Sequence, residues 1–367
     1  MSVKSYTHDL GIKRKFAIGF LVLLWALSGC NLPQQRPAPA ECEQDPVITT
    51  MLSKTTLPDW LDWVEKLSGA KPVQIGGEPV KISTRYSYAM FTGQANARAF
   101  DYVLEQVRAW YPDSQIEIEE YPYTDAERTY TWKNLIVTIP GQTRPQESVI
   151  LSAHLDDTVV KQGDALKVAP GADDNAVGVA ALLEAARIFR ANKFERTIRL
   201  IWFSGEEEGS AGSMAYVNTH SMAGVVGNIT LDMFGYDNDG DRCLEIHAGA
   251  LPESDRIGRC FQNTAKSNGI NLNYDYLTTG ASDRSDHASF WKKSVGSVVV
   301  IENFIQQNIP GGCKGIDVNP NYHRPGDKVE ALNQGFAFDI VRAGLATTAS
   351  LARPLRQAYP LFPWLTK

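Results

Sequence analysis

The chain has 367 residues, of which 43% are hydrophobic, and a chain of this size can bury a large core. Its formal net charge is −6 at pH 7 and its pI is about 5.6, which excludes the basic surface of most nucleic-acid-binding proteins. We therefore expect no nucleic-acid partner.

The first thirty residues have the pattern of a targeting segment. Lys13, Arg14 and Lys15 precede an apolar run over residues 16–27. The run is only about a dozen residues long, too short to span a bilayer as a helix. A basic start, a short apolar stretch and small residues at its end are typical of a secretory signal. We predict that residues 1–29 are a signal peptide.

The signal ends in Leu27-Ser28-Gly29-Cys30, which resembles the lipobox of bacterial lipoproteins. The resemblance implies cleavage before Cys30 and a lipid anchor on its sulfur. An ordinary signal peptide with a chance cysteine is the alternative. Asn31 follows, whereas an Asp there usually retains lipoproteins in the inner membrane, so the resemblance implies the outer membrane, facing the periplasm or the cell surface. Residues 30–56 are predicted to be a tether, rich in Pro, Gln and Ala at its start.

Four further cysteines are Cys42, Cys243, Cys260 and Cys313. An even number in an exported chain is compatible with two disulfides, for which there are three pairings. One or two buried free thiols are the alternative.

After the tether, the apolar residues follow regular patterns. Helical spacing predicts helices over residues 59–67, 95–110, 176–190 and 213–219. Alternating or continuous apolar runs predict strands over residues 115–121, 135–137, 148–153, 197–203, 228–233 and 296–301. Buried strands that alternate with helices favour an α/β fold with a largely parallel sheet. We predict one catalytic domain over residues 57–352 and a C-terminal tail over 353–367.

Metal-binding residue types follow several of these strands. His154, the pair Glu206-Glu207 and Asp232 lie at or just past strand ends, where open parallel sheets bind ligands. Asp174 lies in a glycine-containing turn that opens a helix, and His323 comes late in the chain. A catalytic zinc takes nitrogen and oxygen ligands, and two zinc ions about 3.5–4 Å apart can share one carboxylate. The ordered set therefore predicts a two-metal site.

In two pairs of neighbouring residues in this set, one residue can bind metal while the other has a supporting role. Asp156 lies two residues after His154 and can orient its imidazole from behind. Glu206 and Glu207 are adjacent and diverge in direction, so one can bind metal while the other acts as a base on water. Either pair alone is more often a solvated surface feature, so the prediction depends on the complete set.

These residues stand in segments that resemble the secreted bacterial leucyl aminopeptidases. Those enzymes belong to a family of co-catalytic zinc metallopeptidases that also includes aminopeptidase Y and glutamate carboxypeptidase. The segments are His154-Leu155-Asp156, Gly171-Ala172-Asp173-Asp174-Asn175, Gly205-Glu206-Glu207, Leu231-Asp232-Met233, Ser285-Asp286-His287-Ala288-Ser289 and Asn319-Pro320-Asn321-Tyr322-His323. The resemblance covers roughly residues 57–350. It implies a three-layer α/β sandwich of the zinc-exopeptidase type, with a mixed, mostly parallel sheet.

The resemblance also implies a role for each matched position, with two Zn²⁺ ions per chain. The implied metal ligands are His154, Asp174, Glu207, Asp232 and His323. Asp174 would bridge both ions and is preferred over Asp173, the weaker candidate, because it directly precedes Asn175. His154 and Asp232 would complete one site, and Glu207 and His323 the other. Glu206 would be the general base, and Asp156 would orient His154.

The implied activity is hydrolysis of N-terminal residues from peptides. Separately, we expect the domain to be monomeric. A glutaminyl cyclase-like acyltransferase with one zinc, or a carboxypeptidase or other amidohydrolase on the same fold, are the alternatives. Related carboxypeptidases usually insert a lid domain between the last two ligands, but only 91 residues (323 − 232) separate them here. A non-catalytic relative would lose ligands, and none is lost.

The sequence departs from the leucyl aminopeptidases just before the Ser-Asp-His segment. Those enzymes carry a disulfide-closed loop with a Tyr there, but residues 278–284 contain neither Cys nor Tyr. The oxyanion helper therefore stays open among Tyr274, Tyr276 and Tyr322.

Other polar residues are predicted to lie outside the ligand set. His287 is predicted to be structural, and His8, His220 and His247 to be incidental. Residues 237–241 have the composition of a calcium loop but lack the Glu of an EF-hand, which favours a solvated turn.

Overall fold

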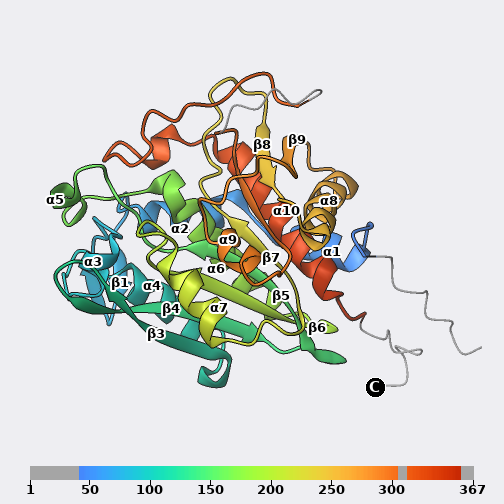
Figure 1. The fold of residues 1–367 in the computed structure, drawn as a ribbon, viewed down its shortest axis with the longest axis horizontal. Coiled ribbons are helices and arrows are strands. Elements are labelled where there is room, and N and C mark those ends of the chain that lie inside the picture. The colour runs from blue at the N-terminus through green and yellow to red at the C-terminus, as the bar shows by residue number, and fades with distance from the viewer. Residues whose placement is uncertain (1–40, 305–311, 357–367) are drawn as a thin grey trace, which may run out of the picture. The chain divides into compact units, whose positions relative to one another are not determined.

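The computed structural model describes residues 41–304 and 312–356 (Figure 1). The predicted signal peptide, the lipobox and the first part of the predicted tether lie outside these residues. None of the helices in the described part of the chain combines the length and apolar character needed to cross a membrane.

A twisted eight-stranded sheet forms the centre of the body (Figure 1). In spatial order its strands are β3 (Ile116–Thr124), β4 (Thr129–Ile139), β6 (Arg196–Phe203), β5 (Arg144–His154), β7 (Val225–Leu231), β10 (Ser297–Glu302), β8 (Cys243–His247) and β9 (Asn273–Leu277). The four central strands, β6, β5, β7 and β10, run parallel to one another. Antiparallel pairing occurs on either side of them, and β8 and β9 are parallel. The predicted mixed, mostly parallel sheet is confirmed.

Helices cover both faces of this sheet (Figure 1). One face packs against α1 (Pro46–Leu52), α2 (Leu57–Leu67), α4 (Ala99–Arg108), α6 (Val177–Phe189), α8 (Pro252–Ser267) and α10 (Gln334–Ala352). The other packs against α7 (Ala211–Thr219) and α9 (His287–Trp291). In β5, Val149 and Leu151 face the first layer and Ile150 the second. Both faces of this strand are thus buried, as a central parallel strand requires.

Each predicted helix and strand coincides with an observed one, with its ends moved by a few residues. The predicted strand 228–233 ends at Leu231, so Asp232 lies just beyond it. The remaining elements were not predicted: α1, α8, α9, α10, β8, β9, the hairpin β1 (Val73–Ile75) and β2 (Glu78–Val80), and the short helices α3 (Ser87–Met90) and α5 (Gln162–Ala165).

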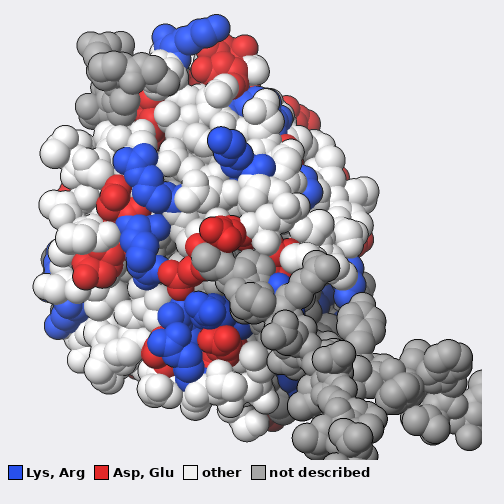
Figure 2. Space-filling model, turned by 90° about the vertical axis from the view of Figure 1, so that its right-hand side faces the viewer, with Lys and Arg blue, Asp and Glu red and all other residues white. Residues whose placement is uncertain are grey.

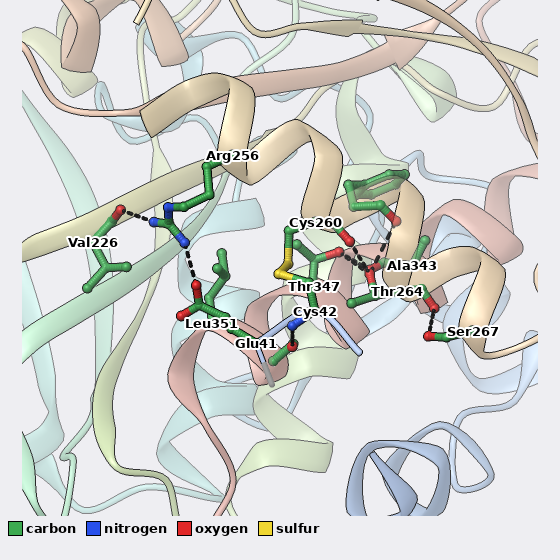
Figure 3. The surroundings of a disulfide bond; sticks show 12 residues. Glu41, Cys42, Val226, Arg256, Cys260, Thr264, Ser267, Ala343, Thr347 and Leu351 are labelled. Carbon is green, nitrogen blue, oxygen red and sulfur yellow. Dashed lines mark hydrogen bonds and ion pairs between the residues drawn. A yellow bond between two sulfur atoms is a disulfide. The ribbon is translucent and has the colours of Figure 1, made fainter. Parts of the chain in front are cut away.

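The folded body begins earlier than the predicted boundary at residue 57. Helix α1 buries Ile48, Met51 and Leu52, and Cys42 forms a disulfide with Cys260 on α8 (Figure 3). The predicted tether 30–56 was therefore too long, because Cys42 and α1 are attached to the folded body.

A second disulfide joins Cys243 on β8 to Cys313. The structure thereby selects one of the three possible pairings and excludes free thiols at these four positions. The two bonds close loops of 218 and 70 residues, and long closed loops restrict the unfolded chain most.

Surface charges of both signs are interspersed on the face drawn in Figure 2. On α8, for example, Arg256 pairs with Glu41 and Arg259 pairs with Asp255. The expectation of no nucleic-acid partner stays a prediction from net charge.

Candidate metal centre

The fold brings three of the predicted segments to one edge of the sheet. His154 is the last residue of β5 and pairs in register with Phe203, the last residue of β6. Glu206 and Glu207 follow β6, and Asp232 follows β7. Because β5, β6 and β7 are parallel, their carboxyl ends meet at the same edge.

The five predicted ligands form two groups that share one carboxylate. Nε2 of His154 lies 3.0 Å from Oδ1 of Asp232 and 3.2 Å from Oδ1 of Asp174. Nε2 of His323 lies 2.9 Å from Oε2 of Glu207 and 3.3 Å from Oδ2 of Asp174. Asp174 therefore turns one oxygen toward each histidine, which is the geometry of a bridging ligand.

The donor atoms of these groups fit divalent cations. Within each group the candidate ligand atoms lie within 4.8 Å of one another. Oε1 of Glu207 is buried without a hydrogen-bond partner, and burial together with the Asp174 carboxylate raises the pKa of Glu207 to about 7. Buried carboxylates in such proximity are costly unless a cation neutralises them. A mixed set of imidazole and carboxylate ligands suits zinc.

The turn over residues 170–175 presents Asp174 to both histidines. It needs glycine at its start, because Gly171 has a φ of +45° and a Cβ there would overlap the Asp174 carbonyl oxygen. The carboxylate of Asp327 then accepts the N–H of Asp173 (2.9 Å) and of Asp174 (3.0 Å). Two backbone donors that the turn leaves free are thus satisfied, which fixes the Asp174 backbone.

The neighbouring Asp173 points elsewhere. Its carboxylate accepts the N–H of Gly235 at 2.6 Å and the side-chain amide of Asn319 at 2.8 Å. The structure thus places Asp174 between the histidines and gives Asp173 a role in holding the surrounding loops.

Asp156 contacts its predicted partner His154 and also the Glu206-Glu207 loop, which was not predicted. Nδ1 of His154 donates to the backbone carbonyl of Asp156 at 3.1 Å, whereas the nearest carboxylate oxygen is 3.7 Å away. That carboxylate instead accepts the N–H of Glu206 at 3.2 Å and of Glu207 at 3.3 Å. Asp156 therefore orients His154 chiefly through its main chain and fixes the Glu206-Glu207 loop through its side chain.

Glu206 lies in the wall of a pocket that opens onto this centre. Its enclosure raises the pKa of Glu206 well above the usual range, although His154 opposes the shift. The nearby carboxylates of Asp232 and Glu207 raise it further. A carboxyl group that holds its proton more tightly is suited to proton transfer near neutral pH.

Residues 134–347 match Peptidase family M28. The chain belongs to this family. It is 27% identical over 252 residues to leucine aminopeptidase 2 of Trichophyton rubrum, a match that covers 65% of this chain and 48% of that protein. It is 28% identical over 232 residues to aminopeptidase YwaD of Bacillus subtilis, covering 62% and 46%. The chain thus spans about half the length of the curated relatives it matches.

Solved structures share the fold. The LapA aminopeptidase of Legionella pneumophila superposes with a TM-score of 0.65 at 17% identity, covering 95% of this chain and 81% of that one. The glutaminyl cyclase of Porphyromonas gingivalis gives 0.60 at 18% identity, covering 80% and 97%. At such identities the likeness establishes the α/β fold alone.

The pocket of this M28 peptidase is lined by both apolar and polar side chains. The apolar ones are Met233, Val299, Ile301 and Phe304, and the polar ones besides the candidate ligands and Glu206 include His247, Ser282, Arg284, Ser285 and His287. Tyr322 also lines the pocket and stacks on His323, with ring centroids 3.8 Å apart. Of the three candidate tyrosines only Tyr322 lies there, because the hydroxyl of Tyr276 is bound to Asp255 and Tyr274 packs against the core.

Two histidines hold the loop over residues 278–284, which precedes the Ser-Asp-His segment. Nδ1 of His247 accepts the N–H of Ser282 at 2.8 Å, and Nε2 of His287 donates to the Ser282 carbonyl at 2.9 Å. His247 is itself held by Glu245, at 2.7 Å. The prediction that His247 is incidental was wrong. Its place at the end of β8 was the available signal, and that strand was not predicted.

Proposed function

We propose that the chain is an aminopeptidase that uses two zinc ions. The observation that carries this proposal is the Asp174 carboxylate, which offers one oxygen to each of two histidine-containing groups. Membership of Peptidase family M28 and the named aminopeptidase relatives support it.

His154 and Asp232 would hold one ion, Glu207 and His323 would hold the other, and Asp174 would contribute to both sites. When bound, such ions supply Lewis acidity and lower the pKa of a water molecule toward neutrality.

The protein's own residues then transfer the proton and hold the reacting groups in position. The Glu206 carboxylate accepts a proton from the attacking water while the water oxygen adds to the scissile carbonyl carbon. Glu206 next delivers this proton to the departing amine as the carbon–nitrogen bond breaks. Asp156 keeps the Glu206 backbone in place through the N–H bond described above.

We expect peptide substrates with a free N-terminal amine, which lies against the centre and limits cleavage to the first residue. The test compares an aminoacyl substrate with its N-acetylated form, using the purified soluble part of the chain. Acetylation should nearly abolish turnover, and chelators should abolish it until zinc is restored. Efficient cleavage of N-blocked peptides would exclude an aminopeptidase and favour a carboxypeptidase or another amidohydrolase.

A glutaminyl cyclase is the second candidate, because the chain matches nearly the whole length of the Porphyromonas gingivalis cyclase. The set of five candidate ligands favours two zinc ions per chain, whereas a glutaminyl cyclase is expected to bind one. Metal analysis discriminates the two, as does incubation with an N-terminal glutaminyl peptide, from which a cyclase would release ammonia without cleaving the chain.

We also propose that the chain is a lipoprotein anchored through Cys30, in the outer membrane and facing the periplasm or cell surface. Two disulfides support an oxidising compartment. Cys30→Ala should prevent lipidation in cells without altering turnover by the purified protein. Membrane association that persists in this variant would refute the anchor.

A further inference from the structure

Two consecutive buried residues, Arg85 and Tyr86, lie just before α3 in a segment that the family match does not include. The match begins at residue 134. The side chain of Arg85 is fully buried and Tyr86 is 4% exposed. A fully buried guanidinium is unusual and needs partners for its charge and donors.

The partners of Arg85 are all backbone carbonyls. Its guanidinium donates five hydrogen bonds, through Nε to Leu155 (2.9 Å), through Nη1 to Leu67 (3.2 Å) and Pro170, and through Nη2 to Gly171 (2.8 Å) and Asp174 (3.2 Å). A guanidinium has five N–H donors in a planar, rigid fork. One group therefore fixes three separate chain segments in a single plane.

Four of these carbonyls belong to the two segments that carry His154 and Asp174, and the fifth is that of Leu67 on α2. Leu155 stands between His154 and Asp156, and Asp174 is the proposed bridging ligand. Arg85 thus sets the distance between the end of β5 and the turn over residues 170–175. That distance determines how closely Nε2 of His154 approaches Oδ1 of Asp174, 3.2 Å in this structure.

Tyr86 holds the other carboxylate loop. Its hydroxyl donates to Oε1 of Glu208 at 3.3 Å, and the hydroxyl of Tyr123 donates to Oε2 of the same residue at 3.3 Å. Glu208 directly follows Glu207. At the start of this loop, Gly205 lies against the ring of Trp132, which stacks on Tyr123 with centroids 3.9 Å apart. The loop is thus fixed at both ends.

We propose that Arg85 and Tyr86 are positioning residues for the metal centre. They hold the Asp174 turn and the loop over residues 205–208 at the separation that two metal ions need. Neither residue lines the pocket, so their effect passes through Asp174 and Glu207. The inference rests on the proposed function, because it assumes that these carboxylates bind metal.

The test uses Arg85→Lys and Tyr86→Phe in the full chain. Lysine keeps the charge but has three donors and no fork, and phenylalanine removes only the hydroxyl. Two controls remove equivalent groups elsewhere. Arg196→Lys alters a buried arginine bound to Glu41 and Glu147, and Tyr111→Phe removes a buried hydroxyl bound to the Ala186 carbonyl at 2.6 Å.

Zinc affinity is measured by titrating the chelator-treated protein, and kcat and KM are measured at saturating zinc. Loss of groups that orient metal ligands costs about 10- to 100-fold in metal affinity or activity. We expect a loss of this size in zinc affinity for Arg85→Lys and a smaller one for Tyr86→Phe. In both, kcat should fall more than KM changes, while the controls keep the original values.

Original zinc affinity and kcat in folded Arg85→Lys and Tyr86→Phe, with only a lower unfolding midpoint, would overturn the proposal. If Arg85→Lys does not fold, Tyr86→Phe decides alone. An unmodified chain that binds zinc but cleaves no aminoacyl substrate would refute the aminopeptidase while leaving this inference intact, because zinc affinity is measured independently of turnover. An unmodified chain that binds no zinc would overturn both.

Discussion

In the described part of the chain, carboxylates gather both at the metal centre and in an acidic turn, and the two clusters differ in what surrounds them. The metal centre combines Asp174, Glu207 and Asp232 with two histidines at the carboxyl edge of the parallel strands. The acidic turn, which consists of Asp237, Asp239, Asp241 and Asp317, lies beyond β7 and is partly exposed.

Each carboxylate of the acidic turn accepts a backbone N–H with one of its oxygens. Asp237 accepts the N–H of Gly240, Asp239 that of Asp241, and Asp241 that of Cys243. At the metal centre, in contrast, Oε1 of Glu207 has no partner and imidazole nitrogens face the oxygens. Proximity of carboxylates is therefore a weak criterion for a metal site. A buried carboxylate oxygen without a hydrogen-bond partner, next to imidazole nitrogens, is a stronger criterion.

The largest effect is expected at the shared ligand. Among the described residues, Asp174 is the only carboxylate within 4 Å of both histidines, so we expect Asp174→Ala to lose zinc from both sites and turnover to fall to background. Asp173→Ala leaves the N–H of Gly235 without its acceptor, at a cost of about 1–3 kcal/mol in unfolding free energy, but should retain zinc. Metal analysis and thermal unfolding of both variants measure this. Zinc loss in Asp173→Ala alone would reverse the assignment.

A smaller effect is expected for the residue that faces the pocket without belonging to either ligand pair. Glu206→Gln should retain both metals and lower kcat by about 100-fold or more, the usual scale for a lost general base. Metal content and kcat are measured on the same preparation. If zinc disappears in this variant, Glu206 and Glu207 have been assigned in the wrong order.

Most residues of the candidate metal centre could be predicted from the sequence because they directly follow predicted strands or lie in a glycine-containing turn. His154, Glu206 and Asp232 follow apolar runs that no other element type explains well, and the order of the strands then places them together. The candidate ligand His323 follows no predicted strand, and its prediction came from the family resemblance. The fold class followed from the same strands.

Contacts between distant segments were not predictable from a single sequence. The residues next to Arg85 in the sequence do not indicate that its guanidinium binds five backbone carbonyls, because those carbonyls belong to other segments. Asp317 joins the acidic turn from 76 residues beyond Asp241 (317 − 241), and only the structure shows it. The packing of α1 onto the body was missed because burial of this helix depends on α10 and on the disulfide at Cys42.

A third effect concerns how the two regions are held together. The disulfide between Cys243 and Cys313 joins the strand after the acidic turn to the segment that leads to Asp317. Replacing both cysteines with serine should lower the free energy of unfolding by about 2–4 kcal/mol. Because Cys243 and Cys313 group with Asp275 and not with the metal centre's ligands, zinc content and kcat should persist below the new midpoint. Loss of zinc in the folded variant would show that the disulfide positions His323.

The smallest effect is expected in the acidic turn itself. Asp239→Asn keeps an oxygen that can accept the Asp241 N–H, and it changes one exposed carboxylate. Surface substitutions of this kind usually stay within about 0.5 kcal/mol. If the turn is a solvated structure whose carboxylates serve its own backbone, millimolar calcium should not shift the unfolding midpoint of the original chain or of the variant. A calcium-dependent rise in the original chain that Asp239→Asn removes would show that the turn binds a cation. The distinction drawn between the two carboxylate groups would then fail, because satisfied backbone contacts would not have prevented metal binding.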